Sequence, residues 1–452
     1  MKRWVGALIV TLLGCVLIFL QRSSDPGLLQ DTDTRVLLAT IRERHAPFSW
    51  FTGDWPLGNH FYRPISTLAF ELDNRLYGSA AWGYGLTNAL LCVACTLLLF
   101  WYLRELTDRP LLTGASTFIF VCWQTGETFW LIQAAQIVAL AAIVGGLIRH
   151  RLKVRNWLPA AFVAYEVAIQ LRIAQPLSYR VIGWLPGRTA SVMALFALAA
   201  LATYARYERL SAERRLPDPT PLDPPATRST TQAKATHRGV WIWPILSIFC
   251  TALALGAYEQ AVMLPAILLA TACTMRWQGY RVRWGWQAAF WSALVGYMAL
   301  RHAFVPSDPS HYQLQQFRKG PGVWISLSGY TIPSVFTLMT ASAWVSSLPI
   351  SLFTDAPWLA LLEVATDVTT FVQARRRWVL AFAGLGMSFL AFLPMAWVKQ
   401  FEHYHYWPLA LRSLFVAVLA WIALELTANA WSPQTRQAPP RPDPAPGSLP
   451  RP

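Results

Sequence analysis

The stretch FYRPISTLAFELDNRLYGSAAWGYGLTNALLCVACTLLLFWYLREL, residues 61–106, decides the fold class because a polar helix and an apolar helix follow each other in it. Its second half contains Trp82–Tyr102, an uncharged run of about 20 residues, which is long enough to cross the hydrocarbon core of a bilayer. Such runs recur along all 452 residues, and the chain is 55% apolar and 13% charged. Soluble domains have about 25% charged residues. The sequence therefore predicts an all-α polytopic membrane protein with about 11–13 membrane helices.

The first half of the stretch, Phe61–Gly78, predicts a short amphipathic helix. Pro64 suits its first position and Gly78 a left-handed end. About 14 helical residues span roughly 21 Å, and the segment is too short and too polar to cross a bilayer. We expect it to lie in the outer membrane interface, as one wall of a headgroup site or as a simple loop anchor. Its apolar face is formed by Ile65, Leu68, Ala69, Leu72 and Leu76.

The whole chain, including this stretch, divides into four predicted parts. Trp4–Leu20 is expected to be an uncleaved first helix with a cytoplasmic N-terminus, since no small-x-small cleavage site follows it. A long non-cytoplasmic loop, residues 21–81, comes next. Both termini are expected in the cytoplasm of a cell with a plasma (inner) membrane, and the topology of residues 324–373 stays open. The parts are an N-terminal membrane module (1–207), a disordered cytoplasmic linker (208–239), C-terminal membrane helices (240–430) and a disordered Pro-rich tail (431–452).

The net charge of +15 does not indicate nucleic-acid binding. The basic residues cluster between apolar runs, as in Arg149–Arg155 and Arg276–Arg283, which is typical of cytoplasmic loops rather than of one folded basic surface. All six cysteines fall inside apolar runs, so no disulfide framework is predicted.

Four segments resemble, in order, polytopic membrane glycosyltransferases of the GT-C superfamily. The relatives are the protein O-mannosyltransferase-like and transmembrane-tetratricopeptide proteins, here without the repeat tail. The resemblance covers about residues 30–430, and it departs where WQTGET replaces a histidine-containing outer loop and where Ala190 replaces an acidic residue. The segments are the opening stretch, IGWLPGRTASVMALFALAALATYARY, LALGAYEQAVMLP and FLAFLPMAWVKQFEHYHYWPLAL.

The resemblance implies an inverting transfer of a sugar from a polyprenyl-phosphate lipid to a protein or glycan acceptor on the non-cytoplasmic face. Such a reaction needs a carboxylate base, positive charge or a metal for the leaving phosphate, and a groove for the isoprenoid. A divalent cation is the only cofactor considered, and no ligand set is assigned to it.

Acidic residues in the first outer loop are the catalytic candidates that the resemblance implies. Asp33 is the first choice and Asp31 the second, unless one of them caps the helix that follows. Asp54 is the third candidate, with a turn-forming role as its alternative. Glu127, in the next outer loop, is a candidate second carboxylate or metal ligand, or else a solvated turn residue.

The candidates for binding the donor phosphate or sugar are basic, aromatic and acidic residues near the outer face. Arg63 and Arg188 are expected to contact phosphate, unless they reach headgroups instead. His403 and His405 lie in the aromatic EHYHYWP segment, which is either a sugar and phosphate contact or an interfacial belt. The remaining candidates are Tyr62 and Glu259.

Two other classes of function remain open. One is a binder or transporter of lipid-linked sugars without transfer chemistry, and the other is a cell-envelope assembly protein. A transferase is expected to gather outer carboxylates around one lipid-accessible cavity, whereas a scaffold has no such cavity.

Overall fold

The computed structural model describes residues 2–44, 46–150, 154–213, 240–333 and 368–431. These ranges contain helices and no strand, with one isolated bridge between Phe317 and Val398. The predicted all-α class is confirmed for this part of the chain.

The long helices form the body of the molecule. Several of them begin with proline in the first turn, where its missing N–H costs no hydrogen bond. Their bounds are α1 (Val5–Leu20), α4 (Ala81–Thr107), α5 (Pro110–Thr125), α6 (Thr128–His150), α7 (Val154–Gln170), α9 (Arg188–Glu213), α11 (Ile242–Leu255), α12 (Leu264–Trp277), α13 (Gly285–Phe304), α18 (Val368–Phe392) and α19 (Tyr406–Trp431).

Shorter elements connect the long helices. The short α-helices are α2 (Thr32–Arg44), α3 (Pro64–Tyr77), α8 (Leu177–Val181), α14 (His311–Gln316) and α15 (Pro321–Thr331). The 3-10 turns are η1 (Lys2–Trp4), η2 (Pro26–Leu29), η3 (Pro47–Thr52), η4 (Leu185–Gly187), η5 (Glu259–Met263), η6 (Leu393–Trp397) and η7 (Glu402–His405).

Six helical segments among the described residues are long and apolar enough to cross a membrane, which makes the protein a multi-pass membrane protein. This is fewer than the 11–13 expected from the sequence. Length accounts for two of the helices: the apolar helices α1 and α11 have only 16 and 14 residues, below the about 20 that a spanning helix needs. The six segments are Ala81–Thr107, Thr128–Gly145, Leu185–Ala212, Glu259–Trp277, Arg377–Trp397 and Glu402–Ala428.

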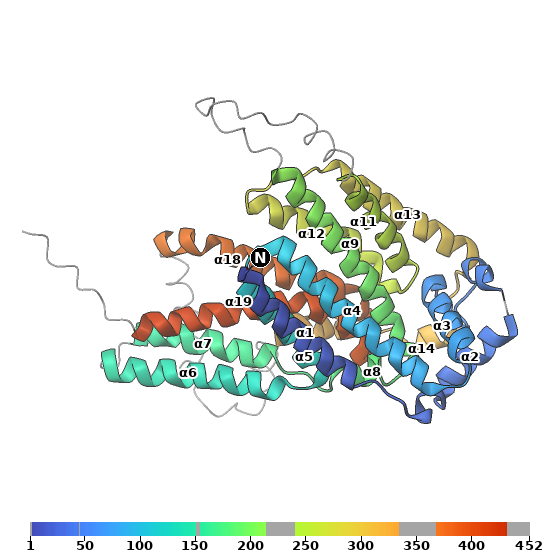
Figure 1. The fold of residues 1–452 in the computed structure, drawn as a ribbon, viewed down its shortest axis with the longest axis horizontal. Coiled ribbons are helices and arrows are strands. Elements are labelled where there is room, and N and C mark those ends of the chain that lie inside the picture. Colours follow the sequence, from blue (N-terminus) through green and yellow to red (C-terminus); the bar gives the residue numbers. More distant parts are fainter. Residues whose placement is uncertain (1, 45, 151–153, 214–239, 334–367, 432–452) are drawn as a thin grey trace, which may run out of the picture.

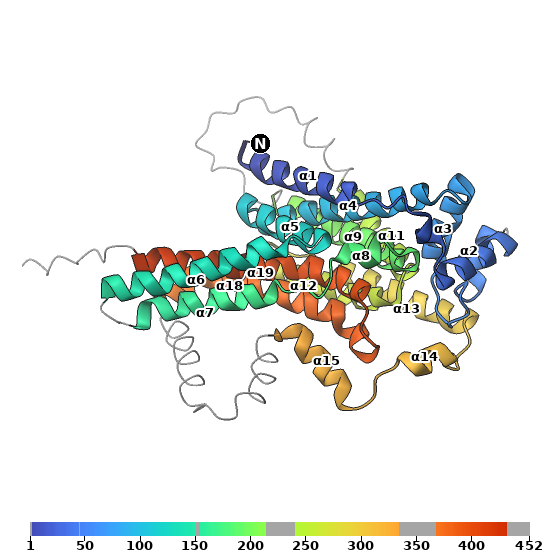
Figure 2. The same ribbon diagram turned by 90° about the horizontal axis from the view of Figure 1, so that it is seen from below.

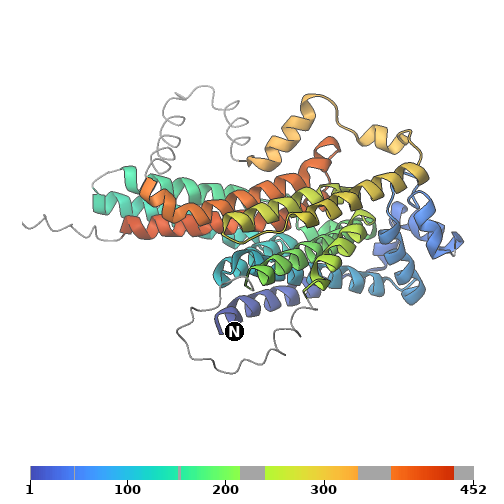
Figure 3. The same ribbon diagram turned by 90° about the horizontal axis from the view of Figure 1, so that it is seen from above.

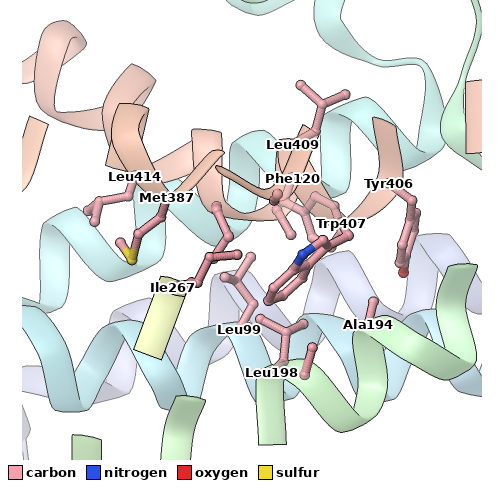
Figure 4. Close-up of a cluster of buried hydrophobic side chains, with 14 of the residues drawn as sticks. Leu99, Phe120, Ala194, Leu198, Ile267, Met387, Tyr406, Trp407, Leu409 and Leu414 are labelled. Carbon is pink, nitrogen blue, oxygen red and sulfur yellow. The ribbon is translucent and has the colours of Figure 1, made fainter. Parts of the chain in front are cut away.

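Helices α6, α7, α18 and α19 lie side by side, and α2, α3 and α14 gather at one end of the molecule, which we call the loop end (Figures 1 and 2). The view from above gives the same arrangement (Figure 3). Helix α19 packs against α5, α6, α7, α9 and α18. Figure 4 shows its buried Trp407 beside Leu99 of α4 and Leu198 of α9, and its buried Leu414 beside Met387 of α18. The core is therefore built around the last helix of the described ranges.

The start of the predicted linker differs in the structure. Helix α9 continues to Glu213, and Glu208 is buried with its carboxylate accepting the backbone N–H of Arg283. The prediction that the linker begins at residue 208 is therefore wrong. A buried carboxylate needs a hydrogen-bond donor, and the backbone just before α13 supplies one to Glu208. Residues 214–239 and the tail 432–452 lie outside the described ranges, as does most of 324–373.

Helix α3 has the predicted bounds but packs through its polar face. Ser66, Glu71 and Asp73 are buried, whereas Leu72 and Leu76 are 57% and 63% exposed. The buried groups have partners: the Ser66 hydroxyl donates to the Ala257 carbonyl at 2.8 Å, and Glu71 accepts from the Trp50 indole at 2.7 Å. Of the apolar face, Leu72 and Leu76 are thus left outward, whereas Ile65, Leu68 and Ala69 are half-buried; contact with a membrane interface remains a prediction.

Candidate functional site

Two of the predicted catalytic carboxylates hold the loop in shape. Asp54 accepts the backbone N–H groups of Trp55, His60 and Phe61 at 2.7, 3.0 and 2.8 Å. Asp31 accepts the Thr34 N–H at 3.3 Å and the indole N–H of Trp184 at 3.1 Å. Both side chains therefore have the structural roles named as their alternatives: Asp54 stabilises a turn and Asp31 caps a helix.

Asp33 lies in the first turn of α2 and is largely exposed. Partial burial and the nearby Asp31 charge raise the pKa of its carboxyl above the ordinary range. Burial raises the pKa of Tyr312, the charge of Arg63 lowers it, and the charge of Asp33 raises it. Glu127, by contrast, is exposed just before α6. Unlike Asp31 and Asp54, Asp33 holds no turn or helix cap among the described contacts.

Arg63 and Glu259 form a two-point ion pair at the loop end. The Arg63 Nε lies 2.8 Å from Oε2 of Glu259, and Nη2 lies 2.7 Å from the same oxygen. The side chains are 12% and 19% exposed, and the guanidinium stacks on Phe61 and Tyr258 at 4.2 and 4.5 Å. Burial lowers the pKa of Arg63, but Glu259 and Tyr258 outweigh it, and the net pKa is raised. The pair leaves Arg63 little capacity for the expected grip on two phosphate oxygens.

This ion pair is part of the wall of a cavity of about 270 Å³, which we call the tyrosine cavity. Tyr258, Tyr297, Tyr312 and Tyr404 line it, together with Arg301. Tyr297 is 6% exposed, and its hydroxyl has no hydrogen-bond partner within the described ranges. Unpaired buried polar groups are costly, so a ligand with hydroxyl groups fits this wall.

A second cavity of about 530 Å³ lies beside α15 and the start of α19, and we call it the arginine cavity. Arg172, Arg318 and Arg412 line it. The Arg412 side chain lies over the Tyr330 ring at 4.2 Å, is 4% exposed, and donates through Nη2 to the carbonyls of Tyr330 and Thr331. Its Nε has no partner in the part of the chain that the structure describes.

The charges around the arginine cavity favour anions. Glu402 lines it, but this carboxylate pairs with Arg180 at 3.5 Å. Glu166 does not line the cavity, and its carboxylate accepts a hydrogen bond from the Gln170 amide at 2.7 Å. Neither Arg172 nor Arg318 has a carboxylate within 4.0 Å among the described side chains. The cavity therefore carries excess positive charge.

The two predicted histidines differ in their access to the cavities. His405 lines the arginine cavity and stacks with Tyr330 and Phe392 at 5.5 and 5.3 Å. His403 is 6% exposed and packs against Trp184 and Tyr404 at 5.3 and 4.3 Å, outside the linings of both cavities. Only His405 is thus placed to contact a bound molecule.

Arg188 and Tyr62 support the structure and line neither cavity. Arg188 is fully buried, lies 2.6 Å from Asp73, and donates to the Tyr84 carbonyl at 3.0 Å. Tyr62 donates to the Phe51 carbonyl at 2.9 Å and its ring packs on Tyr297 at 5.9 Å. Of the group Asp33, Glu127, Arg63 and His403, only Arg63 lines either of these two cavities of the described ranges.

Sequence reasoning missed the arginine cavity. Arg412 had a usable signal, because it is a charged residue inside the apolar segment Glu402–Ala428 and such residues mark functional sites by default. Arg318 and Tyr312 carried no comparable signal, since their neighbours come from distant parts of the chain.

The described ranges contain no group of three or more His, Cys, Asp or Glu residues that could hold a metal ion. No protein-family model, curated protein or solved structure matches the chain.

Proposed function

We propose that the protein is a membrane glycosyltransferase that moves a sugar from a polyprenyl-phosphate-linked donor to a protein or glycan acceptor at the loop end. The loop end would face the non-cytoplasmic side of a plasma (inner) membrane, with both termini in the cytoplasm. No step of the proposed reaction passes through a metal.

The arginine cavity carries this proposal. Arg172, Arg318 and Arg412 can donate charge-assisted hydrogen bonds to phosphate oxygens, for which a planar guanidinium is well suited. The same cavity has apolar walls that suit an isoprenoid chain, including Ile325 on α15, which is 53% exposed. In a ligand with a charged headgroup and a long apolar chain, the headgroup can contact the arginines and the chain can contact the apolar wall.

The tyrosine cavity suits the sugar. Val398 and Tyr404 line it, and Gln400, Phe401 and Glu402 from the same segment line the arginine cavity, so the two cavities are neighbours. Tyrosine rings can cover the apolar face of a sugar, and the paired charges and the free Tyr297 hydroxyl can meet its hydroxyl groups.

The transfer step assigns Asp33 the role of general base. The acceptor oxygen attacks the anomeric carbon, and the bond from that carbon to the phosphate oxygen breaks with its electron pair going to the leaving polyprenyl phosphate. The acceptor proton goes to the Asp33 carboxylate, whose raised pKa makes it a stronger base than an ordinary aspartate. The guanidinium groups of the arginine cavity stabilise the departing phosphate.

The test is a transfer assay in liposomes with a panel of radiolabelled polyprenyl-phosphate sugars, alongside donor binding measured separately. Arg172→Gln with Arg318→Gln should weaken donor binding at least tenfold, because two charge-assisted contacts are lost. Asp33→Asn should reduce transfer by about 10²–10⁴-fold while binding persists. Glu43→Gln, an exposed change on the same helix, and Arg281→Gln are the matched controls. Full transfer in Asp33→Asn would remove this residue from the mechanism.

A second candidate, a lipid-linked-sugar binder without transfer, is favoured by one observation. The carboxylates that line the cavities, Glu259 and Glu402, are both paired with arginines. Donor binding that depends on Arg172 and Arg318, with no transfer by the wild type from any donor, would support this candidate.

A further inference from the structure

A third cavity lies where the N-terminus meets the ends of α4 and α9. This cleft has a volume of about 430 Å³, and we call it the N-terminal cleft. It is lined by Arg3, Trp4, Val5 and Leu8 from the start of the chain, and by Arg104 and Arg206 among others. It shares no lining residue with the tyrosine or arginine cavity.

The cleft carries an excess of positive charge. Four guanidinium groups line it, from Arg3, Arg104, Arg206 and Arg209, against the two carboxylates of Glu105 and Asp108. Asp108 lies 3.0 Å from Arg3 and 2.9 Å from Arg209, and the buried Glu105 lies 3.4 Å from Arg206. The carboxylates hold the arginines in place but balance only half of their charge.

The apolar wall of the cleft continues along α1. Val5 and Leu8 line the cleft and are 51% and 41% exposed. The opposite face of α1, with Thr11, Gly14 and Ile18, is buried against the bundle. From the cleft, exposed residues repeat at helical spacing to the end of the helix and form one continuous stripe: Val5, Leu8, Ile9, Leu12, Leu13, Val16, Leu17 and Leu20.

Trp4 joins the charged and apolar parts of the cleft. Its indole is covered by the guanidinium groups of Arg104 and Arg3 at 5.5 and 5.8 Å and packs edge-on against Phe100 at 6.3 Å. Tryptophan prefers the boundary between headgroups and acyl chains. Along the cleft, the arginines, Trp4 and the apolar stripe of α1 thus follow one another in the same order as the charged headgroup, the interface region and the acyl chains of a phospholipid.

We propose that the N-terminal cleft binds the headgroup of an anionic phospholipid, whose acyl chains lie along the exposed stripe of α1. A soluble phosphate compound would use the arginines but leave the stripe unused. A zwitterionic lipid would cover the stripe but bring no net charge to the excess guanidinium groups.

The test is native mass spectrometry of the full-length protein in detergent, titrated with dioleoylphosphatidylglycerol or dioleoylphosphatidylcholine. Arg104→Gln with Arg206→Gln should weaken phosphatidylglycerol binding by roughly 30-fold, because each basic residue near a membrane surface contributes about fivefold. Binding of phosphatidylcholine should be the same in both proteins. Arg104→Lys with Arg206→Lys keeps the charge and should keep most of the binding, which separates lost charge from misfolding.

The matched control is Arg276→Gln with Arg281→Gln, which removes two exposed charges outside the cleft. An equal loss in this control would mean that only general charge matters and would overturn the assignment. Displacement of phosphatidylglycerol by glycerol 3-phosphate at equal concentration would overturn it in another way, by making the cleft a site for soluble phosphate.

Discussion

Charged side chains at the loop end fall into two classes that differ in their partners. The side chains of Arg188 and Arg63 are 0% and 12% exposed; they pair with Asp73 and Glu259 at 2.6 and 2.7 Å, and their charges are used within the protein. Arg412 is equally buried, but carbonyl groups and an aromatic ring surround it, and its Nε has no partner within the described ranges. A buried charge without a carboxylate is costly, which is why Arg412 marks a site and Arg188 does not.

The Arg188–Asp73 pair should be essential for stability. Asp73→Ala leaves a fully buried guanidinium without its partner and is expected to cost about 3–5 kcal/mol in the free energy of unfolding. Replacing both residues, as Asp73→Leu with Arg188→Met, should recover most of that loss. Denaturant unfolding in detergent measures both values. A single variant as stable as the wild type would show that the pair contributes little.

The pH dependence of the proposed transfer should follow Asp33. A general base works only when deprotonated, so activity falls as the pH falls through its pKa. Because burial and Asp31 raise this pKa, the acidic limb should lie above the value of about 3.9 of an ordinary aspartate. A pH–rate profile locates the limb, and Asp31→Asn should move it to lower pH. A limb unchanged by Asp31→Asn would assign it to another group.

Helix α3 shows how a single element can join the membrane bundle to the first loop. Phe70, on its buried side, packs against Trp55 at 5.9 Å within a small apolar cluster that also includes Leu37 and Ile41 of α2. The opposite side leaves Leu72 open. The loop segment therefore has a core of its own, separate from the main bundle core.

Substitutions on the two sides of α3 should differ in cost. Phe70→Ala removes a side chain with no exposed area and should cost about 3–5 kcal/mol, whereas Leu72→Ala, at a site 57% exposed, should cost less than about 1 kcal/mol. Thermal unfolding of the two variants in the same detergent provides the comparison. Equal costs would mean that α3 packs the other way.

Close packing between α4 and the first loop depends on Gly85. A Cβ at this position would meet the Ser23 carbonyl oxygen at 1.8 Å, and a backbone atom cannot move away easily. Gly85→Ala should therefore destabilise the protein. Gly296→Ala on α13 has nothing within 4 Å and should be neutral or stabilising by up to about 1 kcal/mol. Similar effects of the two changes on unfolding would contradict this contact.

The limits of sequence-based prediction differ between these elements. The bounds of α3 follow from Pro64 and Gly78 and were predicted correctly, because helix ends depend on local residues. Its buried face was not predictable, because the partners Ala257 and Arg188 are distant in the chain. The same reason explains the site: Arg63 was found near a conspicuous motif, but its pairing with Glu259 was not foreseen.

The N-terminal cleft and the other two cavities are lined by different parts of the bundle. The tyrosine and arginine cavities involve the loops between helices, whereas the N-terminal cleft lies at the start of α1 and the last residues of α4 and α9. Chain direction accounts for this, because successive helices reverse direction and bring alternate connections to the same end (Figure 1). The bundle thus offers different surfaces to the two sides of a membrane.

The orientation in the membrane can be tested with introduced cysteines. Five of the six native cysteines are buried and Cys273 is half-buried, so background labelling should be low. Phe48 is 83% exposed in the first loop, and Phe48→Cys should react with a membrane-impermeant thiol reagent in intact cells. Arg281→Cys should react only after the membrane is opened. The reverse pattern would invert the proposed topology.

The contacts of α3 also impose an order on biogenesis. Arg63 and Ser66 find their partners 196 and 191 residues later in the chain, at Glu259 and Ala257. At a synthesis rate of about 5–20 residues per second, the ribosome needs roughly 10–40 s to make that intervening chain. During this interval Arg63 and Ser66 lack these two partners, whereas Glu71 can already accept the hydrogen bond from Trp50. These two contacts between α3 and the bundle can therefore form only after the chain has been made as far as Glu259.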